Sequence, residues 1–578
     1  MGILSAVFQA VVGFIASGLT AVGVSASVAT AAANIIVGAG LTVLSGAFRR
    51  RPRLSVPDQQ SVLNQSTGPR IRGYGRDKLG GTRAFWDSKD GTLYQIVMHH
   101  SGVVDEIESV WLGDQTYSLS GNGWVVGDDD IPNETIRIRT LNGSPNQTAF
   151  DVMTAAWPGV WTEDHRLRGI ACTYAQFNGV DAEDFAKVYP EGAQTAVRIL
   201  ARLSRVYDPR TGETAWSENS ALCMLDYLRH ADGFPGITTA DVDLASFGAF
   251  ANVCAQGVPL RAGGSQARYR LGGTYSLQDD PVDVLHSMQA TCDADLYLTP
   301  EGKIGVRGGV WQPPTVTITD RDILSFDLSE GTDKLAAFNE VKIVFRDPKA
   351  SYQPNEAPAW RNTVDQAARG QIVEDLTLDM VQWPAQAQRL AKIHAHRMNP
   401  RWRGTISTNL VGLRAWGERF ITLVIPEMHI DGPFYIERRA FRTDMSGLEF
   451  EIYSLGPEAY AWTTAEEGVP SPPPAGTKPS RTIEVPAVDE ITTPLRTIGS
   501  TTGYVIQLTV LEPARTGLSL VAQFRLSPSG PWEAMSAVDL TAVSGIVSEG
   551  ETYEVRARWK TSSNVVSAWL EPPETVEV

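Results

Sequence analysis

The fold of the central part of the chain is decided by the stretch VYDPRTGETAWSENSALCMLDYLRHADGFPG, Val206–Gly236. Its first half predicts two short strands joined by a Pro-Arg-Thr-Gly turn, because these residue types favour tight turns. Its second half predicts a helix that begins after the candidate caps Ser217 and Asn219 and closes near Asp232–Gly233. The expected apolar face of this helix consists of Leu222, Leu225, Tyr227 and Leu228.

Two further helices are expected downstream, each followed by strands. The first begins after Asp280 and has Pro281 in its first turn, where the missing N–H of proline costs little. Its apolar stripe consists of Val284, Leu285, Met288 and Cys292, and the strands ADLYLT and KIGVRG follow around a Pro-Glu-Gly turn. The second helix is the amphipathic run Trp383–Asn399, with helical spacing of Ala387, Leu390, Ala391 and His394. Four strands are expected after it: GTISTNLVGL, RFITLVIP, GPFYIERRAFRTD and LEFEIYSL.

Upstream, the pattern from about Arg70 is typical of strands. Thr92–His100 and Val103–Leu112 are rich in β-branched and aromatic residues. Asp90–Gly91 predicts a turn before the first run, and Ser101–Gly102 separates the two runs. We expect a β-meander or barrel in this part of the chain.

Near the C-terminal end, the composition changes at Glu466–Thr482, EEGVPSPPPAGTKPSRT. Such proline-rich, polar segments resist compact folding and act as semi-rigid spacers. The residues beyond it contain short strands such as YVIQLTVL, LVAQFRLS and TYEVRARWK, with turns between them. This pattern predicts a small β-sandwich.

The N-terminal residues 1–48 contain no Asp, Glu, Lys, Arg or His, and the cluster Arg49–Arg53 follows them. A membrane-spanning helix needs about 20 apolar residues, so the segment is long enough for two short spans or a helical hairpin. A secretory signal is not expected, because the basic cluster follows the apolar run instead of preceding it. Two interpretations stay open: a membrane anchor, or a segment buried in an assembly, where its Gly, Ala and Ser residues would let helices approach closely.

The composition sets limits on function. A chain of 578 residues is too long for one core, and 43% hydrophobic with 20% charged residues is typical of globular domains. The net charge of −16 disfavours direct recognition of nucleic acid, which needs basic surface. The four cysteines, Cys172, Cys223, Cys254 and Cys292, lie in apolar contexts without a CxxC or CxxH pair, so we expect buried free thiols and no zinc site.

Three histidine-containing groups are candidate catalytic or metal-binding sites: His99–His100, His394 with His396, and Glu163–His165. Residues i and i+2 of a helix point to different faces, so His394 and His396 are not expected to share a metal ion. The acidic run Gly127–Asp130 lacks the spaced ligands of a calcium loop. No HExxH, GxSxG, Walker or GxGxxG string is present, so we expect no catalytic residue, metal or cofactor.

The middle of the chain resembles the tail-tip attachment protein family of lambda-like siphophages, often called host-specificity protein J. The family signature, in its usual order, falls on Tyr207, Asp208, Pro209, Trp216, Asn219, Asp226, Tyr227 and Leu228, and Ser220 stands where the family often has proline. The order continues with DDPVDVL, LYLTPEGKIGV, FNEVKIVFRDP (Phe338–Pro348), QAQRLAKIHAHR and SLGPEAYAW (Ser454–Trp462). The resemblance covers roughly residues 70–462; no single motif is diagnostic, whereas the ordered series is fairly specific.

This resemblance implies a homotrimeric hub whose barrels form a pseudo-sixfold ring at the distal tip of a virion tail. The implied partners are the distal tail ring and tail tube proteins, a tape-measure protein, tail fibre proteins and the host cell envelope. The residues expected to contact a membrane or the tape-measure protein are Phe8, Val11, Val12, Phe14, Ile15, Ile35, Ile36 and Leu41. The C-terminal sandwich looks like a fibronectin type III domain, with Trp532 and Tyr553–Trp559 at core aromatic positions and SAWL at its last strand.

The expected fold class is therefore mainly β and multidomain, with β-barrel and small α+β hub domains, a C-terminal β-sandwich and a hydrophobic N-terminal helical segment. The expected divisions are 1–50, 54–165, 166–260, 261–320, 321–380, 381–465, the linker 466–482 and the sandwich 483–578.

For function we expect a structural tail-tip hub and not an enzyme, one that takes part in host attachment and genome ejection. Two alternatives stay open: a cell-envelope anchored adhesion protein and a tail-associated hydrolase.

Overall fold

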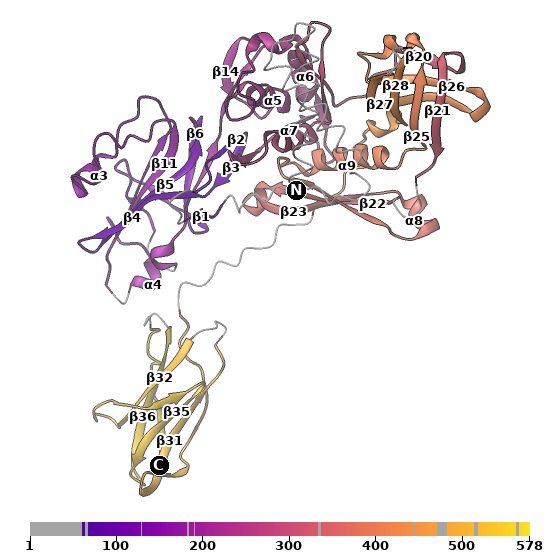
Figure 1. Cartoon of the computed structure of the whole chain (residues 1–578). Coiled ribbons are helices and arrows are strands. Elements are labelled where there is room, and N and C mark those ends of the chain that lie inside the picture. The colour runs from indigo at the N-terminus through magenta and orange to yellow at the C-terminus, as the bar shows by residue number, and fades with distance from the viewer. Residues whose placement is uncertain are drawn as a thin grey trace.

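The computed structural model describes residues 60–63, 68–128, 130–181, 184–189, 191–332, 337–442, 446–470, 483–513, 518–561 and 566–578. Within these ranges the protein is mainly β and has several sheets, including a half-barrel, as the sequence predicts (Figure 1). The charge-free segment 1–48 and its eight expected contact residues lie outside them. Of the helices that the structure describes, none is long and apolar enough to span a bilayer.

Two sheets form the N-terminal unit. The first has the order β1 (Val62–Leu63), β4 (Gly81–Lys89), β5 (Thr92–Ser101), β11 (Ile170–Asn178) and β10 (Ile136–Asn142). The second has the order β3 (Arg76–Leu79), β12 (Val197–Arg202), β6 (Glu106–Leu112) and β7 (Gln115–Thr116). Val97 of the first sheet and Leu112 and Val197 of the second share one buried core. Helix α3 (Asp151–Ala156) contributes Met153 to a separate cluster with Ile96 and Tyr174 of the first sheet.

Asp90–Gly91 makes the predicted turn, with both residues at positive φ, and joins β4 to β5 as a hairpin. Ser101–Gly102 does not make a second hairpin, because β5 and β6 belong to different sheets. After Gly102, the fully buried Val104 donates its N–H to Asn142 O, and Asp105 donates its N–H to Arg202 O. These two contacts carry the chain from the first sheet to the second, so the region is a pair of sheets and not a meander.

The central unit contains the predicted hairpin β13 (Arg205–Asp208) and β14 (Glu213–Trp216) and the predicted helix α5 (Ser220–Arg229), capped by Asn219. Helix α7 (Pro281–Ala290) is capped by Asp280 and leads into β18 (Ala294–Leu298) and β19 (Ile304–Gly308), again as predicted. Helix α6 (Leu244–Ala255) was not predicted; its Phe247 and Phe250 are buried in the same core as α5 and α7.

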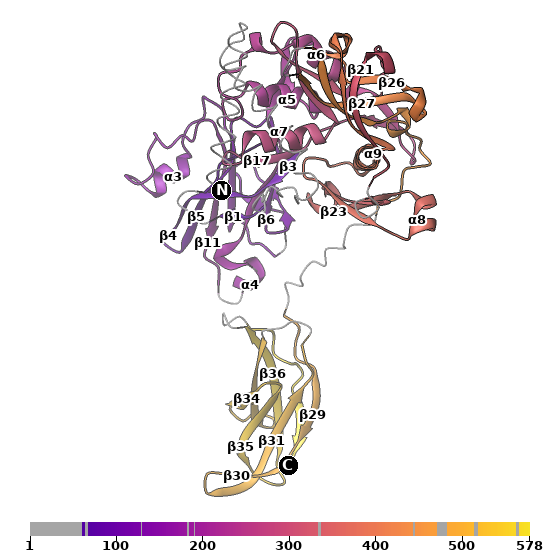
Figure 2. The same ribbon diagram turned by 45° about the vertical axis from the view of Figure 1, so that its right-hand side comes forward.

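A three-stranded sheet extends this core, in the order β23 (Gln353–Arg361), β22 (Glu340–Asp347) and β24 (Val373–Leu378). Helix α9 (Pro384–Met398), the predicted amphipathic helix, buries Ala387, Leu390 and Ala391 against it. A short helix, α8 (Thr363–Arg369), lies between β23 and β24 in the chain. The views in Figures 1 and 2 both place α9 beside β23.

The half-barrel is one six-stranded sheet. Its strand order is β20 (Thr317–Thr319), β26 (Phe420–Ile425), β27 (Ile430–Phe441), β28 (Leu448–Ser454), β25 (Trp402–Thr408) and β21 (Ile323–Glu330). Buried Ile406, Leu423 and Phe450 belong to its core. The two edge strands come from before α9 in the chain, so this sheet does not follow the expected division at residue 381. In the same way, β11 and β12 complete sheets that begin before the expected division at residue 166.

The C-terminal residues form the predicted β-sandwich. One sheet has the order β29 (Val488–Thr492), β31 (Thr501–Val510), β35 (Thr541–Val547) and β34 (Ser536–Val538), with β30 (Leu495–Ile498) also paired to β31. The other has the order β33 (Glu533–Ala534), β32 (Leu518–Leu526), β36 (Thr552–Thr561) and β37 (Glu574–Glu577).

The sandwich differs from the expectation at two aromatic residues. Its core contains Phe524, Tyr553 and Trp559, as expected for the strand Tyr553–Trp559. Trp532 was expected in that core but is half-buried and lies against arginine side chains. The segment SAWL was expected to form the last strand, but Trp569 lies before the actual last strand, β37.

Candidate functional site at two domain junctions

The first junction joins the N-terminal sheets to the central unit through the segment Arg72-Gly73-Tyr74-Gly75. Strand β2 (Ile71–Tyr74) from this segment pairs with β17 (Gly273–Ser276). Tyr74 Oη donates to Asp226 Oδ2 of α5 at 2.8 Å, and Arg72 forms an ion pair with the same oxygen at 3.2 Å. Trp216 Nε1 donates to Gly75 O at 3.0 Å. The Asp226 junction, as we call this group, ties helix α5 to the first part of the chain.

The glycines of this segment are needed for close approach. A Cβ at Gly73 would lie 2.4 Å from Thr274 Cγ2 and 2.6 Å from Gly273 O in the paired strand. Gly75 has φ of +69°, a backbone region that glycine adopts readily, and a Cβ there would lie 2.4 Å from Leu271 O. A side chain at either position would therefore push β2 away from the central unit.

Two neighbouring histidines of β5 are buried and act as hydrogen-bonding groups: His100 contacts β2, and His99 contacts Gly80 and Thr173. His100 Nε2 accepts the Gly73 N–H at 3.0 Å, so the ring carries its proton on Nδ1, which donates to Gly102 O at 3.2 Å. Burial and the nearby Arg72 guanidinium lower the pKa of His100 to about 4. His99 Nε2 lies 2.9 Å from Thr173 Oγ1, and burial lowers its pKa to about 4 as well. Both rings are therefore neutral at pH 7.

The other signature residues lie in and around α5. Asn219 Oδ1 accepts the Ala221 N–H at 3.1 Å, and its Nδ2 donates to Ala251 O at 2.9 Å, which ties α5 to α6. Asp208 stabilises the turn through an ion pair with Arg210, whose Nη2 lies 2.6 Å from Asp208 Oδ2. The remaining signature residues are the buried Tyr227 and Leu228, the half-buried Tyr207 under Arg229, and Pro209 beside α6 at Gly248.

A third contact between these units lies on strand β3. Asp77, fully buried, forms an ion pair with Arg346 Nε of β22 at 3.2 Å. Burial raises the pKa of Asp77 to about 6, although Arg346 opposes the rise. Gln382, just before α9, donates from Nε2 to Arg76 O at 2.7 Å. The N-terminal sheets therefore contact both the helices and the three-stranded sheet of the central unit.

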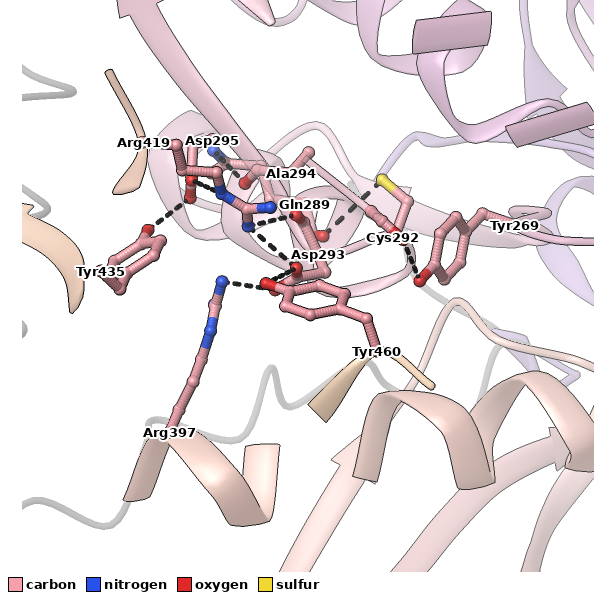
Figure 3. Close-up of polar contacts among 11 residues, drawn as sticks. Tyr269, Gln289, Cys292, Asp293, Ala294, Asp295, Arg397, Arg419, Tyr435 and Tyr460 are labelled. Carbon is pink, nitrogen blue, oxygen red and sulfur yellow. Dashed lines mark hydrogen bonds and ion pairs between the residues drawn. The ribbon is translucent and has the colours of Figure 1, made fainter. Parts of the chain in front are cut away.

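The second junction joins the central unit to the half-barrel (Figure 3). Arg419, which precedes β26, lies between two carboxylates: Nη2 is 2.8 Å from Asp293 Oδ2, and Nε is 2.7 Å from Asp295 Oδ2. Arg397, from the last turn of α9, lies 2.7 Å from Asp293 Oδ1. The side chains of Arg419 and Asp293 are 2% and 4% exposed. We call this group the Asp293 junction.

Tyrosines from the half-barrel side complete the Asp293 junction. Tyr435 of β27 donates to Asp295 Oδ1 at 2.9 Å, and Tyr460 donates to Asp293 Oδ2 at 3.0 Å. The Arg397 guanidinium also lies 4.8 Å from the centre of the Tyr435 ring. The group thus brings together the start of β18, the end of α9, the half-barrel and the segment after it (Figure 3).

Charged groups of the Asp293 junction compensate one another for their burial. Burial alone would raise the pKa of Asp295, but Arg419, Arg397 and Arg307 hold it below its usual value. Burial would likewise lower the pKa of Arg419, yet the two carboxylates and nearby tyrosines raise it well above its usual value. Asp295 and Arg419 are therefore held in their charged forms by the neighbouring groups of opposite charge.

Within the described residues, the three histidine-containing candidate groups do not come together as a catalytic or metal site. His394 stacks on Phe338 and His396 lies against Trp360, so the two rings point to different neighbours, as predicted for positions i and i+2. His165 stacks on Trp161. Among the described residues, no group of three or more His, Cys, Asp or Glu side chains is placed to hold a metal ion.

The four cysteines are free and buried, as expected. Burial raises the pKa of Cys172 to about 12 and raises the pKa values of Cys223 and Cys292 well above their usual range. A thiol with such a pKa is not a ready nucleophile at neutral pH.

The Asp293 junction was missed by the sequence analysis. A signal was present in Cys292-Asp293-Ala294-Asp295, where two carboxylates with a spacing of two interrupt an apolar run between a helix and a strand. Arg419 likewise stands at the start of the apolar strand FITLVI. A buried charge requires a partner, so these residues could have been flagged, although their partners could not.

No family model and no curated protein matches the chain. Among solved structures, it is similar to a chain of the virion of a native gene transfer agent particle, with a TM-score of 0.51 and 14% identity. The match covers 76% of this chain and 98% of that chain. A 43 kDa tail protein of prophage MuSo2 from Shewanella oneidensis matches with a TM-score of 0.26 and 10% identity, over 68% of this chain and 95% of that chain; this overlap carries no conclusion. The chain therefore has the fold of a virion protein.

Proposed function

We propose that the protein is a structural component of the tail of a siphophage or a related tail-like particle, and more specifically its tip hub. The observation that carries the proposal is the shared fold with a virion protein along nearly the whole length of that protein. The ordered signature motifs between residues 70 and 462 support the tip position and the resemblance to the host-specificity protein J family.

The proposed role is mechanical and not catalytic. The Asp226 and Asp293 junctions hold the N-terminal sheets, the central unit and the half-barrel to one another through charged groups that are half-buried at Asp226 and buried at Asp293. Breaking a buried ion pair is costly, so a body held in this way transmits a displacement at one end to the other as one piece. Such a body suits a hub that closes the tail channel and responds when the tip meets a cell.

The finer proposals follow from the resemblance. Three copies form the hub and contact the distal tail ring and tail tube proteins, the tape-measure protein and, at the outside, fibres and the host envelope. The apolar residues 1–48 would be sheltered within the trimer until ejection. The net charge of −16 supports a channel wall that does not hold the passing genome.

Absolute quantification of this protein's peptides in purified particles tests the proposal. We expect three copies per tail, from a ratio to a tail protein of known copy number. A copy number in the range of the repeating tube subunit would contradict the hub role. Recovery of the full-length protein in host membranes and not in particles would instead support the cell-envelope alternative, and turnover of peptidoglycan by the purified protein would support the hydrolase.

A further inference from the structure

The outer face of the sandwich carries a continuous stack of alternating arginine and tryptophan side chains. The Cζ atoms of Arg525 and Arg556 lie 4.5 and 4.1 Å from the ring centre of Trp532. Those of Arg556 and Arg558 lie 4.2 and 4.3 Å from the ring centre of Trp569. We call this stack the Arg–Trp ladder; its members in order are Arg525, Trp532, Arg556, Trp569 and Arg558.

The alternation of β36 puts the ladder on the outside of the sheet. Val555, Ala557 and Trp559 are buried in the sandwich core, so Arg556 and Arg558 between them face outward. They pair across the sheet with Gln523 and Val521 of β32. The ladder members are half-buried, so the outer edge of the stack is open to solvent.

Charge is segregated on this face. Residues 483–578 carry twelve acidic and six basic side chains, a net charge of −6. The ladder nevertheless gathers three of the six basic side chains, and Lys560 continues the outward row of β36. Glu554 on the same row is already bonded to Arg525, whose Nε donates to Oε2 at 2.7 Å. Neither Arg556 nor Arg558 forms an ion pair with a carboxylate of the described residues 483–513, 518–561 and 566–578.

The stack decides which ligand groups can bind. The guanidinium faces of the ladder lie against indole rings, so only donors in the guanidinium plane can reach a ligand. Arg556 already uses Nε and Nη2 on Gln523 Oε1, at 3.1 and 2.7 Å, while Arg558 donates no hydrogen bond to a described residue. Planar guanidinium edges match carboxylate and phosphate oxygens. Arg556 and Arg558, two residues apart on one strand, are about 7 Å apart, which suits two anionic groups on one polymer.

We propose that the Arg–Trp ladder is a binding site for acidic polysaccharide, with Arg556 and Arg558 holding carboxylate or phosphate groups on neighbouring sugars. Duplex DNA is disfavoured, because its dense phosphate charge would meet a sandwich whose net charge is −6 and which offers only one narrow basic strip. This binding is independent of the copy number or position of the protein in a particle, so it can fail or hold separately from the hub proposal.

Binding of the full-length protein to immobilised polymers at 50 mM NaCl tests the site. The probes are polygalacturonate for carboxylate, dextran phosphate for phosphate, neutral dextran and duplex DNA. We expect wild-type protein to bind at least one acidic polysaccharide and not dextran. Arg556→Gln with Arg558→Gln should weaken that binding about tenfold or more, since hydrogen bonds to charged groups are lost. Arg496→Gln, which removes one arginine charge from β30 on the other sheet, should stay within about twofold.

Arg558→Lys keeps the positive charge but loses the planar guanidinium group. It is the test variant to use if the double variant does not fold. We expect it to weaken binding about threefold or more, with the amides of β36 still protected from hydrogen exchange. The proposal is overturned if wild-type protein binds neither acidic polysaccharide, if it binds duplex DNA or dextran equally well, or if Arg558→Lys and the double variant bind as wild type does. The last result would leave the ladder a stabilising feature only.

Discussion

Arg419→Met removes the guanidinium that joins both carboxylates of the Asp293 junction, at nearly constant side-chain length. Three donor contacts are lost: to Asp293 Oδ2 at 2.8 Å, to Asp295 Oδ2 at 2.7 Å and to Asp293 O at 3.1 Å. Removing one partner of a buried pair costs about 3–5 kcal/mol. Arg397 still pairs with Asp293, so we expect a loss near the lower end, about 3 kcal/mol.

The assay is native-state hydrogen exchange, because a chain with several cores does not have a single unfolding free energy. The opening free energy should fall at the amides of β18 and β26, on both sides of the junction, and stay unchanged in the sandwich. The matched control is Arg401→Met, which removes an ion pair with Glu330 whose side chains are 70% and 55% exposed. That control should cost less than about 1 kcal/mol.

The loss should also depend on pH in a defined direction. In the wild type, the folded-state pKa of Asp295 is lowered, so its contribution is present above the unfolded-state pKa and lost as pH falls through the folded value. Without Arg419, the largest charge that opposes the effect of burial is lost, so we expect the folded-state pKa of Asp295 to rise above its unfolded-state value. As pH falls, Asp295 then takes up its proton in the folded variant before it does so in the unfolded chain. The loss of opening free energy relative to wild type should therefore be smaller at pH 5 than at pH 7. A deficit equal to that of Arg401→Met, or one that grows toward pH 5, would refute the reasoning.

Three further predictions concern the buried groups outside this junction. His99 has its pKa lowered from 6.5 to about 4, so the unfolded chain takes up the proton first and stability is lost as pH falls from about 6.5 toward 4. His99→Gln should therefore lose about 2 kcal/mol less opening free energy than wild type between pH 7 and pH 5, measured by hydrogen exchange at the amides of β5; an unchanged pH slope would contradict this. Asn219→Ala should lower the protection of α5 amides by about 1–2 kcal/mol, through loss of the cap and the contact with Ala251. The thiols should react with a disulfide reagent only after unfolding in guanidinium, because all four are buried; prompt labelling of Cys172 in the native protein would count against the structure.

The sequence predicted the elements whose signals are local. Asn219 and Asp280 cap their helices, Asp90–Gly91 turns its hairpin, and the short strands after Trp383–Asn399 are present. It did not predict which strands share a sheet, because β20 and β21 join strands from the other side of α9. Pairing over such separations is set by packing and not by local propensity.

The junctions show the same limit. Arg419 and Asp293 are 126 residues apart in sequence, so the polar residues could be recognised as unusual but not matched. Trp532 was expected in the sandwich core because the resemblance to fibronectin type III domains places a core aromatic residue there. Flanking arginines instead hold it on the outer face, where the indole stacks on two guanidinium groups. A hydrophobic pattern alone does not reveal such a stack, because its arginines come from two different strands, β32 and β36.

The central claim is that three copies of this protein form the hub at the tail tip. Electron microscopy of particles that carry a gold label on the C-terminal sandwich tests it most directly. We predict that the label lies only at the distal end of the tail, with threefold symmetry in averaged images. Label distributed along the tube, or absent from the tail, would contradict the claim.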